Sequence, residues 1–87
     1  MEKKPLVLLV DDEQDLCTLM QMSLSRMGID THIAYRLQEA VQALKTHQYD
    51  ACLTDLNLPD GNGLSLVDFL AQNYPNLPVA VLTAYGN

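Results

Sequence analysis

The 87-residue sequence predicts an α/β domain built on a doubly wound parallel sheet. Two residue periods alternate along it: short continuous apolar runs, typical of strands covered on both faces, and apolar stripes at helical spacing. An alternation of four strands with three helices requires crossover connections between parallel strands. The expected strands cover residues 6–10, 31–35, 51–55 and 79–83, and the expected helices cover residues 14–27, 37–47 and 64–74.

Each expected element has its own signal, beginning with the uninterrupted apolar run at residues 6–10. The helix after it has an apolar side and is ended by Gly28, as is common for a glycine that follows a helix. That side consists of Leu16, Leu19, Met20, Leu24 and Met27. The second helix follows the expected strand 31–35, and its apolar stripe consists of Leu37, Ala40, Val41 and Leu44.

The last two expected elements are a helix and a strand joined by a short connection that Pro75 and Pro78 bracket. The apolar stripe of that helix consists of Leu64, Val67, Leu70, Ala71 and Tyr74. The strand 79–83 lies four residues before the last residue of the sequence, so we expect it to form an exposed sheet edge.

Composition narrows the possible functions. The hydrophobic fraction of 48% is that of a globular protein, and the formal charge of -6 argues against direct binding of a nucleic-acid backbone. The first residues lack the apolar centre of a signal peptide, and no apolar run is long enough to span a membrane. Cys17 and Cys52 lack the CxxC spacing, so we expect two buried thiols in a reducing cytoplasm.

Acidic residues stand where the expected strands end. The first strand is followed by Asp11 and Asp12, the third ends in Asp55, and the fourth ends in Thr83. Ligands of open parallel sheets lie at the carboxyl ends of the strands, so these side chains are expected to meet at one edge. Three close carboxylates repel one another unless a cation lies among them. Mg²⁺ fits best, because it takes few carboxylates and favours phosphate oxygens.

Each acid also has a simpler interpretation. Asp11 and Asp12 could cap the first helix together with Asp15, and Asp55 could start a turn. A calcium loop starting at Asp55 does not fit, because Pro59 and Asp60 occupy the positions that need an acid or Asn and a Gly. A dehalogenase-type phosphatase would need a second acid where Asn57 stands, and the Gly-rich loop of a P-loop nucleotide site is missing from the sequence.

Three motifs together resemble the receiver domain of bacterial two-component response regulators. They are VDDE at the first strand end, TDLNLPDGNGL at the third and LTAYGN at the fourth, in the family's order. The resemblance covers residues 1–87 and implies a flavodoxin-like sheet with strand order 2-1-3-4. The same resemblance implies that the chain is a signalling switch and not an enzyme acting on a separate substrate.

The resemblance also assigns roles to individual residues. Asp55 would be the phospho-acceptor, and it would bind Mg²⁺ together with Asp12 and with the backbone carbonyl of Asn57. Asp11 would hold the ion through water. Thr83 would be the switch hydroxyl that bonds the phosphoryl oxygen, and Ala84 would leave room for the phosphate. Pro59 and Gly63 would shape the loop behind the acceptor. The phosphoryl donor would be a sensor histidine kinase.

One departure from the family pattern concerns a lysine that receivers carry at the end of a fifth strand. This sequence has no Lys or Arg after Lys45, and the fifth βα unit is missing from it. We therefore interpret it as a receiver truncated after the fourth strand. We expect slow or absent phosphorylation, and a homodimer or exchanged elements to cover the exposed edge of the fourth strand.

The endings TAYGN and LPDGNGL further resemble receivers of NtrC-type, sigma-54-dependent transcription regulators. The resemblance implies an output domain outside this chain, and no direct nucleic-acid or membrane binding by the chain itself. Two other hypotheses remain. One is a non-phosphorylated pseudo-receiver that acts as a protein-interaction module. The other is a metal-dependent hydrolase, for which the sequence offers no general acid or base beyond Asp11, Asp12 and Asp55.

Overall fold

The structure is a computed structural model, which describes residues 3–82. The elements are β1 (Leu6–Val10), α1 (Gln14–Arg26), β2 (Asp30–Ala34), α2 (Leu37–Thr46), β3 (Ala51–Asp55), β4 (Asn57–Leu58), β5 (Gly61–Asn62), α3 (Gly63–Asn73) and β6 (Val79–Leu82). All seven predicted long elements are present, and their bounds lie within about two residues of the expected ones, as far as the described residues extend.

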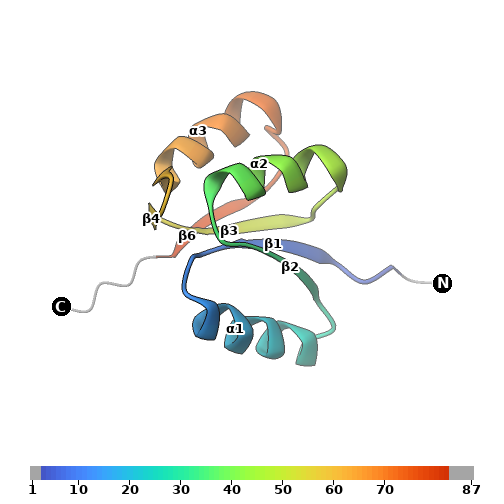
Figure 1. The fold of residues 1–87 in the computed structure, drawn as a ribbon. Coiled ribbons are helices and arrows are strands. Elements are labelled where there is room, and N and C mark those ends of the chain that lie inside the picture. The colour runs from blue at the N-terminus through green and yellow to red at the C-terminus, as the bar shows by residue number, and fades with distance from the viewer. Residues whose placement is uncertain (1–2, 83–87) are drawn as a thin grey trace.

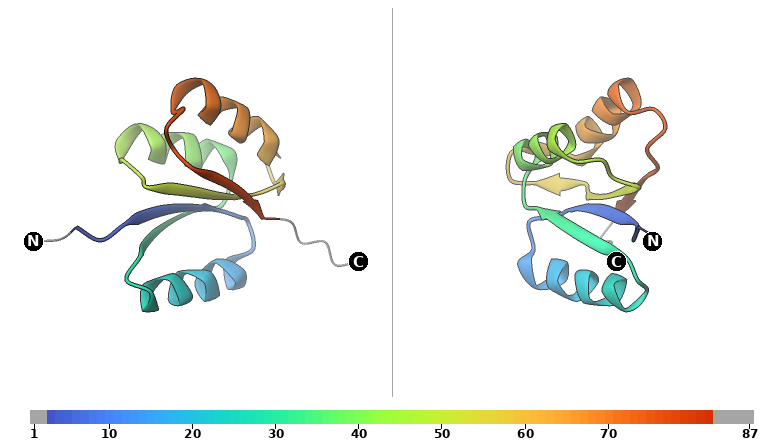
Figure 2. Two further views of the ribbon diagram at one scale, coloured as in Figure 1. Left: turned by 180° about the vertical axis from the view of Figure 1, so that it is seen from behind. Right: turned by 90° about the vertical axis from the view of Figure 1, so that its right-hand side faces the viewer.

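The main sheet has the order β2-β1-β3-β6, and every neighbouring pair of strands is parallel. Since β6 is the fourth long strand, this is the predicted order 2-1-3-4. Figure 1 shows α2 and α3 on one face of the sheet and α1 on the other, and the two turned views in Figure 2 agree. The expected doubly wound, flavodoxin-like architecture is thus confirmed.

The main core lies between the sheet and the pair α2 and α3. Leu8 and Val10 of β1 and Cys52 of β3 face these helices, because alternate residues of a strand point to the same side. Leu44 of α2 and Leu70 of α3 pack against them. Leu66, which the predicted stripe of α3 omits, is only 1% exposed, whereas the predicted Leu64 is 53% exposed. The buried face of α3 is therefore rotated from the predicted one.

The other face of the sheet is covered by α1 alone among the described residues. Val7 and Leu9 of β1 are buried, and Cys17 is the buried residue of α1. Leu19 and Met27 were expected on the buried side of this helix but are 63% and 71% exposed. That expectation was wrong for these two residues, because the apolar stripe of α1 is wider than the surface on which a single helix rests.

The C-terminal end of α1 is followed by a glycine, as predicted. Gly28 has φ of +80°, which a glycine adopts without strain, and its N–H donates to the Ser25 carbonyl.

Both cysteines are free and buried, as expected, and burial raises the pKa of the Cys17 thiol to about 11 and that of Cys52 to about 12. Within residues 3–82, no helix is long and apolar enough to cross a membrane.

One feature of the fold was not predicted. The stretch between β3 and α3 forms a small antiparallel hairpin, in which Asn57 pairs with Asn62 and Leu58 with Gly61. Leu58 is buried in the main core, so the hairpin is held against the sheet by one apolar side chain. The hairpin begins two residues after Asp55 and thus lies next to the predicted site.

Candidate metal centre

Three predicted acids meet at the carboxyl edge of the sheet. Val10 of β1 pairs with Thr54 of β3, so Asp11, the residue after β1, comes beside Asp55, the last residue of β3. Asp11, Asp12 and Asp55 each offer a carboxylate oxygen, and these oxygens all lie within 4.8 Å of one another. The structure therefore confirms that these residues converge, as their placement at strand ends predicted.

The three carboxylates have different environments. Asp11 is buried, Asp12 is exposed and Asp55 is half-buried. Burial raises the pKa of Asp11, and the nearby charges of Asp55 and Asp12 raise it further, while a hydrogen bond from the Glu13 N–H opposes the shift. Without a cation, the folded protein thus resists placing a charge on Asp11. A bound cation would reverse that preference.

The donor set fits a hard divalent cation. It consists of carboxylate oxygens alone, which suit Mg²⁺, and they are few enough for the ion to keep several water ligands. The acids lie in an open hollow of about 530 Å³, which Leu16, Met20 and Leu82 also line. A ligand could therefore approach the cluster from solvent.

The capping alternative for Asp11 and Asp12 does not describe the start of α1. The N-cap residue is Glu13, and its side chain makes no capping hydrogen bond. Asp11 Oδ1 instead accepts the N–H of Glu13 at 2.9 Å, which orients the Asp11 carboxyl group before the helix begins. Asp55 Oδ1 accepts the N–H of Leu56 at 2.8 Å, so this carboxylate also has one oriented oxygen.

Gly63 fits tightly behind Asp55. Its N–H donates to the Leu56 carbonyl at 2.7 Å, and a Cβ at this position would overlap the backbone carbonyl of Asp55. Only glycine therefore lets α3 begin so close to the end of β3. This contact agrees with the predicted role of Gly63 in shaping the loop behind Asp55.

The predicted site residues Thr83 and Ala84 lie outside the described residues. Asn57, the predicted donor of a backbone carbonyl, lies in β4 with an exposed side chain. An exposed side chain is compatible with a role that uses the backbone alone.

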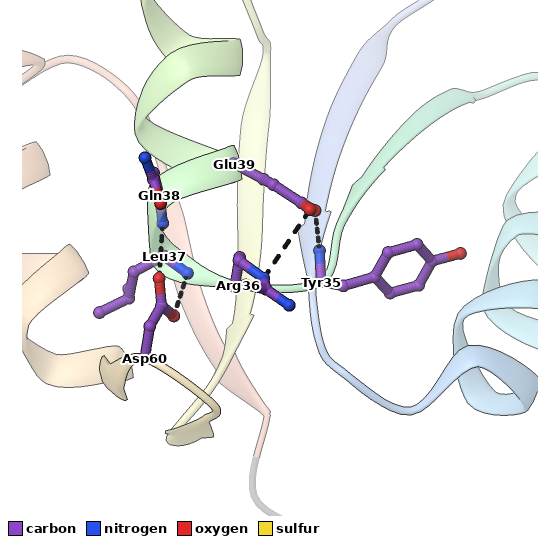
Figure 3. A network of polar contacts seen from close by, with 6 residues as sticks. All are labelled: Tyr35, Arg36, Leu37, Gln38, Glu39 and Asp60. Carbon is purple, nitrogen blue, oxygen red and sulfur yellow. Dashed lines mark hydrogen bonds and ion pairs between the residues drawn. The ribbon is translucent and has the colours of Figure 1, made fainter.

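Sequence reasoning assigned no role to Asp60, yet it links two segments beside the site. Its carboxylate accepts the N–H groups of Leu37 and Gln38, the first two residues of α2 (Figure 3). Slight desolvation would raise the pKa of Asp60, but these bonds and the Arg36 charge together lower it. The only sequence signal was an acid in a turn, which does not reveal a partner more than twenty residues away.

The sequence was compared with models of known protein families. The family model described as "Response regulator receiver domain" matches residues 7–87. The chain belongs to this receiver family. The receiver's acidic cluster and strand order thus agree with the family that the three motifs indicated.

Two curated relatives illustrate the match. The receiver is 48% identical over 80 residues to response regulator protein PilR of Pseudomonas aeruginosa, covering 92% of this chain and 18% of PilR. It is 31% identical over 81 residues to the DNA-binding transcriptional regulator NtrC of Proteus hauseri, covering 93% of this chain and 17% of NtrC. The chain therefore spans less than a fifth of the length of these two relatives.

Solved structures give the same result for the fold. The response regulator TrrA of Thermotoga maritima, in complex with Mg²⁺ and beryllofluoride, matches with a TM-score of 0.90 at 26% identity, covering 94% of this chain and 71% of that one. The beryllofluoride-activated NtrC4 receiver domain dimer matches with a TM-score of 0.87 at 32% identity, covering 94% and 68%.

Proposed function

We propose that this receiver accepts a phosphoryl group on Asp55 from a phosphohistidine of a sensor histidine kinase, with Mg²⁺ held by the acidic cluster. The observation that carries the proposal is the convergence of Asp11, Asp12 and Asp55 within 4.8 Å at the carboxyl edge of the sheet. Membership in the receiver family and the likeness to TrrA, whose structure contains Mg²⁺ and beryllofluoride, support it.

The proposed reaction is a single displacement at phosphorus. A carboxylate oxygen of Asp55 attacks the phosphorus, the P–N bond of the donor breaks, and its electron pair returns to the imidazole nitrogen. The product is an acyl phosphate on Asp55. Mg²⁺, when bound, would supply positive charge beside the phosphoryl oxygens. Asp55 is consumed as a reactant, so we propose a switch and not an enzyme acting on a separate substrate.

The remaining residues of the proposed site hold the ion or respond to the phosphoryl group. Asp12 and Asp55 would bind Mg²⁺ directly, Asp11 through water, and Asn57 through its backbone carbonyl. The Thr83 hydroxyl would bond the new phosphoryl oxygen, and Ala84 would leave space for it. For Thr83 and Ala84 the support is the family motif LTAYGN.

Similarity to PilR and NtrC supports a proposal about output. NtrC is described as a DNA-binding transcriptional regulator, and 93% of this chain aligns with it. We propose that phosphorylation of Asp55 controls a transcriptional output domain in a sigma-54-dependent regulator of the cytoplasm. In this account the 87-residue receiver contacts the kinase and the output domain, and the DNA contacts belong to other parts of the protein.

We also propose that the 87-residue chain self-associates through the outer edge of β6. In the described part of the chain, β6 pairs with β3 alone, and Val81 on β6 is 37% exposed. An unpaired strand edge is a template for pairing with a second copy. Light scattering should give the mass of a dimer, and a stable monomer at high concentration would contradict this proposal.

Phosphorylation can be tested with a small phosphodonor. The protein is incubated with acetyl phosphate and Mg²⁺, and samples are taken over several hours. Intact-mass analysis should show one added phosphoryl group, and borohydride reduction followed by peptide mapping should locate it at Asp55. Excess EDTA should prevent the labelling.

Two variants control this experiment. Asp55→Asn should abolish labelling, whereas Asp68→Asn, which removes an exposed acid from α3, should leave it unchanged. Labelling that survives in Asp55→Asn would contradict the assignment of Asp55. A wild-type protein that binds Mg²⁺ but never becomes labelled would instead favour the alternative of a pseudo-receiver that acts as an interaction module.

A further inference from the structure

Asp60 joins the hairpin next to the site to the start of α2. Its Oδ1 accepts the N–H of Leu37 at 2.7 Å, and its Oδ2 accepts the N–H of Gln38 at 3.0 Å. Figure 3 shows this carboxylate below the first turn of α2, reaching it from the hairpin. The helix therefore receives its N-terminal cap from a residue more than twenty positions later in the chain.

The first turn of α2 needs this external cap. Its own N-cap residue is Arg36, whose side chain makes no capping hydrogen bond. Glu39, in the same turn, is engaged elsewhere: its Oε1 accepts the N–H of Tyr35 at 2.8 Å and its Oε2 lies 3.9 Å from Arg36 Nε. The first free N–H groups of a helix carry partial positive charge and are satisfied best by an acceptor such as a carboxylate.

A second contact fixes the same two segments together. Gly61, the residue after Asp60, packs so closely on Leu37 that a Cβ there would overlap the Leu37 side chain. The turn of the hairpin is thus seated on the first residue of α2 by both a polar and an apolar contact. Buried Leu58 anchors the hairpin in the main core, and the next residue toward the site, Asn57, pairs with Asn62 across the hairpin.

From these contacts we infer that Asp60 is a positioning residue for the metal centre. By anchoring the turn to α2, it fixes the hairpin strand that carries Asn57, whose backbone carbonyl is the proposed ligand for Mg²⁺. The inference rests on the proposed function, because it assumes that the acidic cluster binds Mg²⁺. Groups that hold a metal ligand in place commonly affect metal affinity without touching the ion.

The test compares Mg²⁺ affinity, measured by titration calorimetry, in the wild type and four variants. Asp60→Ala removes both acceptors, and Asp60→Asn removes the charge but keeps an oxygen acceptor. Asp68→Ala removes another exposed acid, from α3. Gln42→Gly weakens the exposed interior of α2 without touching its cap, so it controls for lower stability. Amide exchange at Leu37 and Gln38 reports directly on the cap.

Asp60→Ala should weaken Mg²⁺ binding by about tenfold, the lower end of the effects of groups that orient metal ligands. Asp60→Asn should restore affinity to within about threefold, because Asn caps helices nearly as well as Asp. Asp68→Ala and Gln42→Gly should bind like the wild type, and amide exchange at Leu37 should accelerate only in Asp60→Ala.

Three results would overturn the inference in distinguishable ways. If Asp60→Ala binds Mg²⁺ as tightly as the wild type while its Leu37 and Gln38 amides exchange faster, the anchor has no influence on the metal centre, although the proposed function stands. If the wild type itself does not bind Mg²⁺, the proposed metal centre is wrong and this inference falls with it. Equal weakening in Asp60→Ala and Gln42→Gly would reduce Asp60 to a purely structural role.

Discussion

Asp11 and Asp55 stand side by side at the carboxyl edge of the sheet, because Val10 and Thr54 pair in parallel register one residue earlier. The buried Asp11 carboxyl group therefore faces a second acid, and within residues 3–82 no positive side chain compensates its charge. This arrangement costs stability when both acids are charged, and it becomes favourable once a cation lies between them.

The first prediction concerns Asp11→Asn. The variant keeps an oxygen acceptor for the Glu13 N–H but removes the buried charge. Without Mg²⁺ at neutral pH, we expect it to be more stable than the wild type by about 1 kcal/mol, or several degrees in melting temperature. Mg²⁺ should raise the melting temperature of the wild type more than that of the variant, which keeps Asp12 and Asp55 but loses one charge of the cluster. A variant that is less stable without Mg²⁺, or that Mg²⁺ stabilises as much as the wild type, would contradict the proposed metal centre.

The second prediction gives the pH dependence of the same effect. The pKa of Asp11 is raised in the folded state from 3.8, so the folded protein binds this proton more tightly than the unfolded chain does. In the absence of Mg²⁺, the Asp11 contribution to the unfolding free energy should therefore decrease as pH rises above about 4 and level off above the raised pKa. Urea unfolding of wild type and Asp11→Asn at several pH values gives this contribution as a difference. If the difference in unfolding free energy between wild type and Asp11→Asn does not change with pH, the pKa of Asp11 is not raised in the folded state.

The third prediction compares two glycines. Gly63→Ala should destabilise the protein by about 3 kcal/mol, because its Cβ would overlap the backbone carbonyl of Asp55, which cannot move without disturbing β3. Gly28→Ala is the matched control: nothing lies within 4 Å of its Cβ, and only its φ of +80° opposes the change. That cost is about 1 kcal/mol. Chemical denaturation measures the loss of unfolding free energy in both variants. Equal losses would be inconsistent with the tight contact behind Asp55.

The fourth prediction tests which apolar residues form the core. Leu66→Ala should lower the unfolding free energy by about 2–5 kcal/mol, since the Leu66 side chain is fully enclosed by the main core. Leu19→Ala should change the unfolding free energy by less than about 0.5 kcal/mol, because the Leu19 side chain is 63% exposed. Denaturation curves give both changes. A large decrease in the unfolding free energy of Leu19→Ala would show that Leu19 is buried in solution.

The sequence predicted the sheet well because strands and helices have different apolar periods. The run Leu6–Val10 is apolar throughout, as a strand covered on both faces must be, and its end placed Asp11 at the sheet edge. The order of the strands and the roles of Asp12 and Asp55 came from the motifs. The structure tested the order and the convergence of the acids, and both agree.

Other features depend on tertiary geometry and were missed for that reason. The apolar stripe of α1 indicates which side of the helix faces inward, but not how far the sheet covers it, so Leu19 was misplaced. The hairpin at residues 57–62 needs pairing across a turn, which turn residues alone do not reveal. The cap from Asp60 to Leu37 joins residues more than twenty positions apart, and no local pattern predicts it.

The most direct test of the central claim is ¹⁹F NMR of the protein with beryllofluoride, which TrrA and NtrC4 bear in their solved structures. Protein-bound fluoride resonances are expected only when Mg²⁺ is present, because both the ion and a free Asp55 carboxylate are needed to hold the phosphoryl mimic. These resonances should disappear in Asp55→Asn and on adding EDTA, and persist in Asp68→Asn. Bound resonances that survive in Asp55→Asn, or a wild type with none at saturating Mg²⁺, would contradict the claim that Asp55 is the phospho-acceptor of a metal-dependent switch.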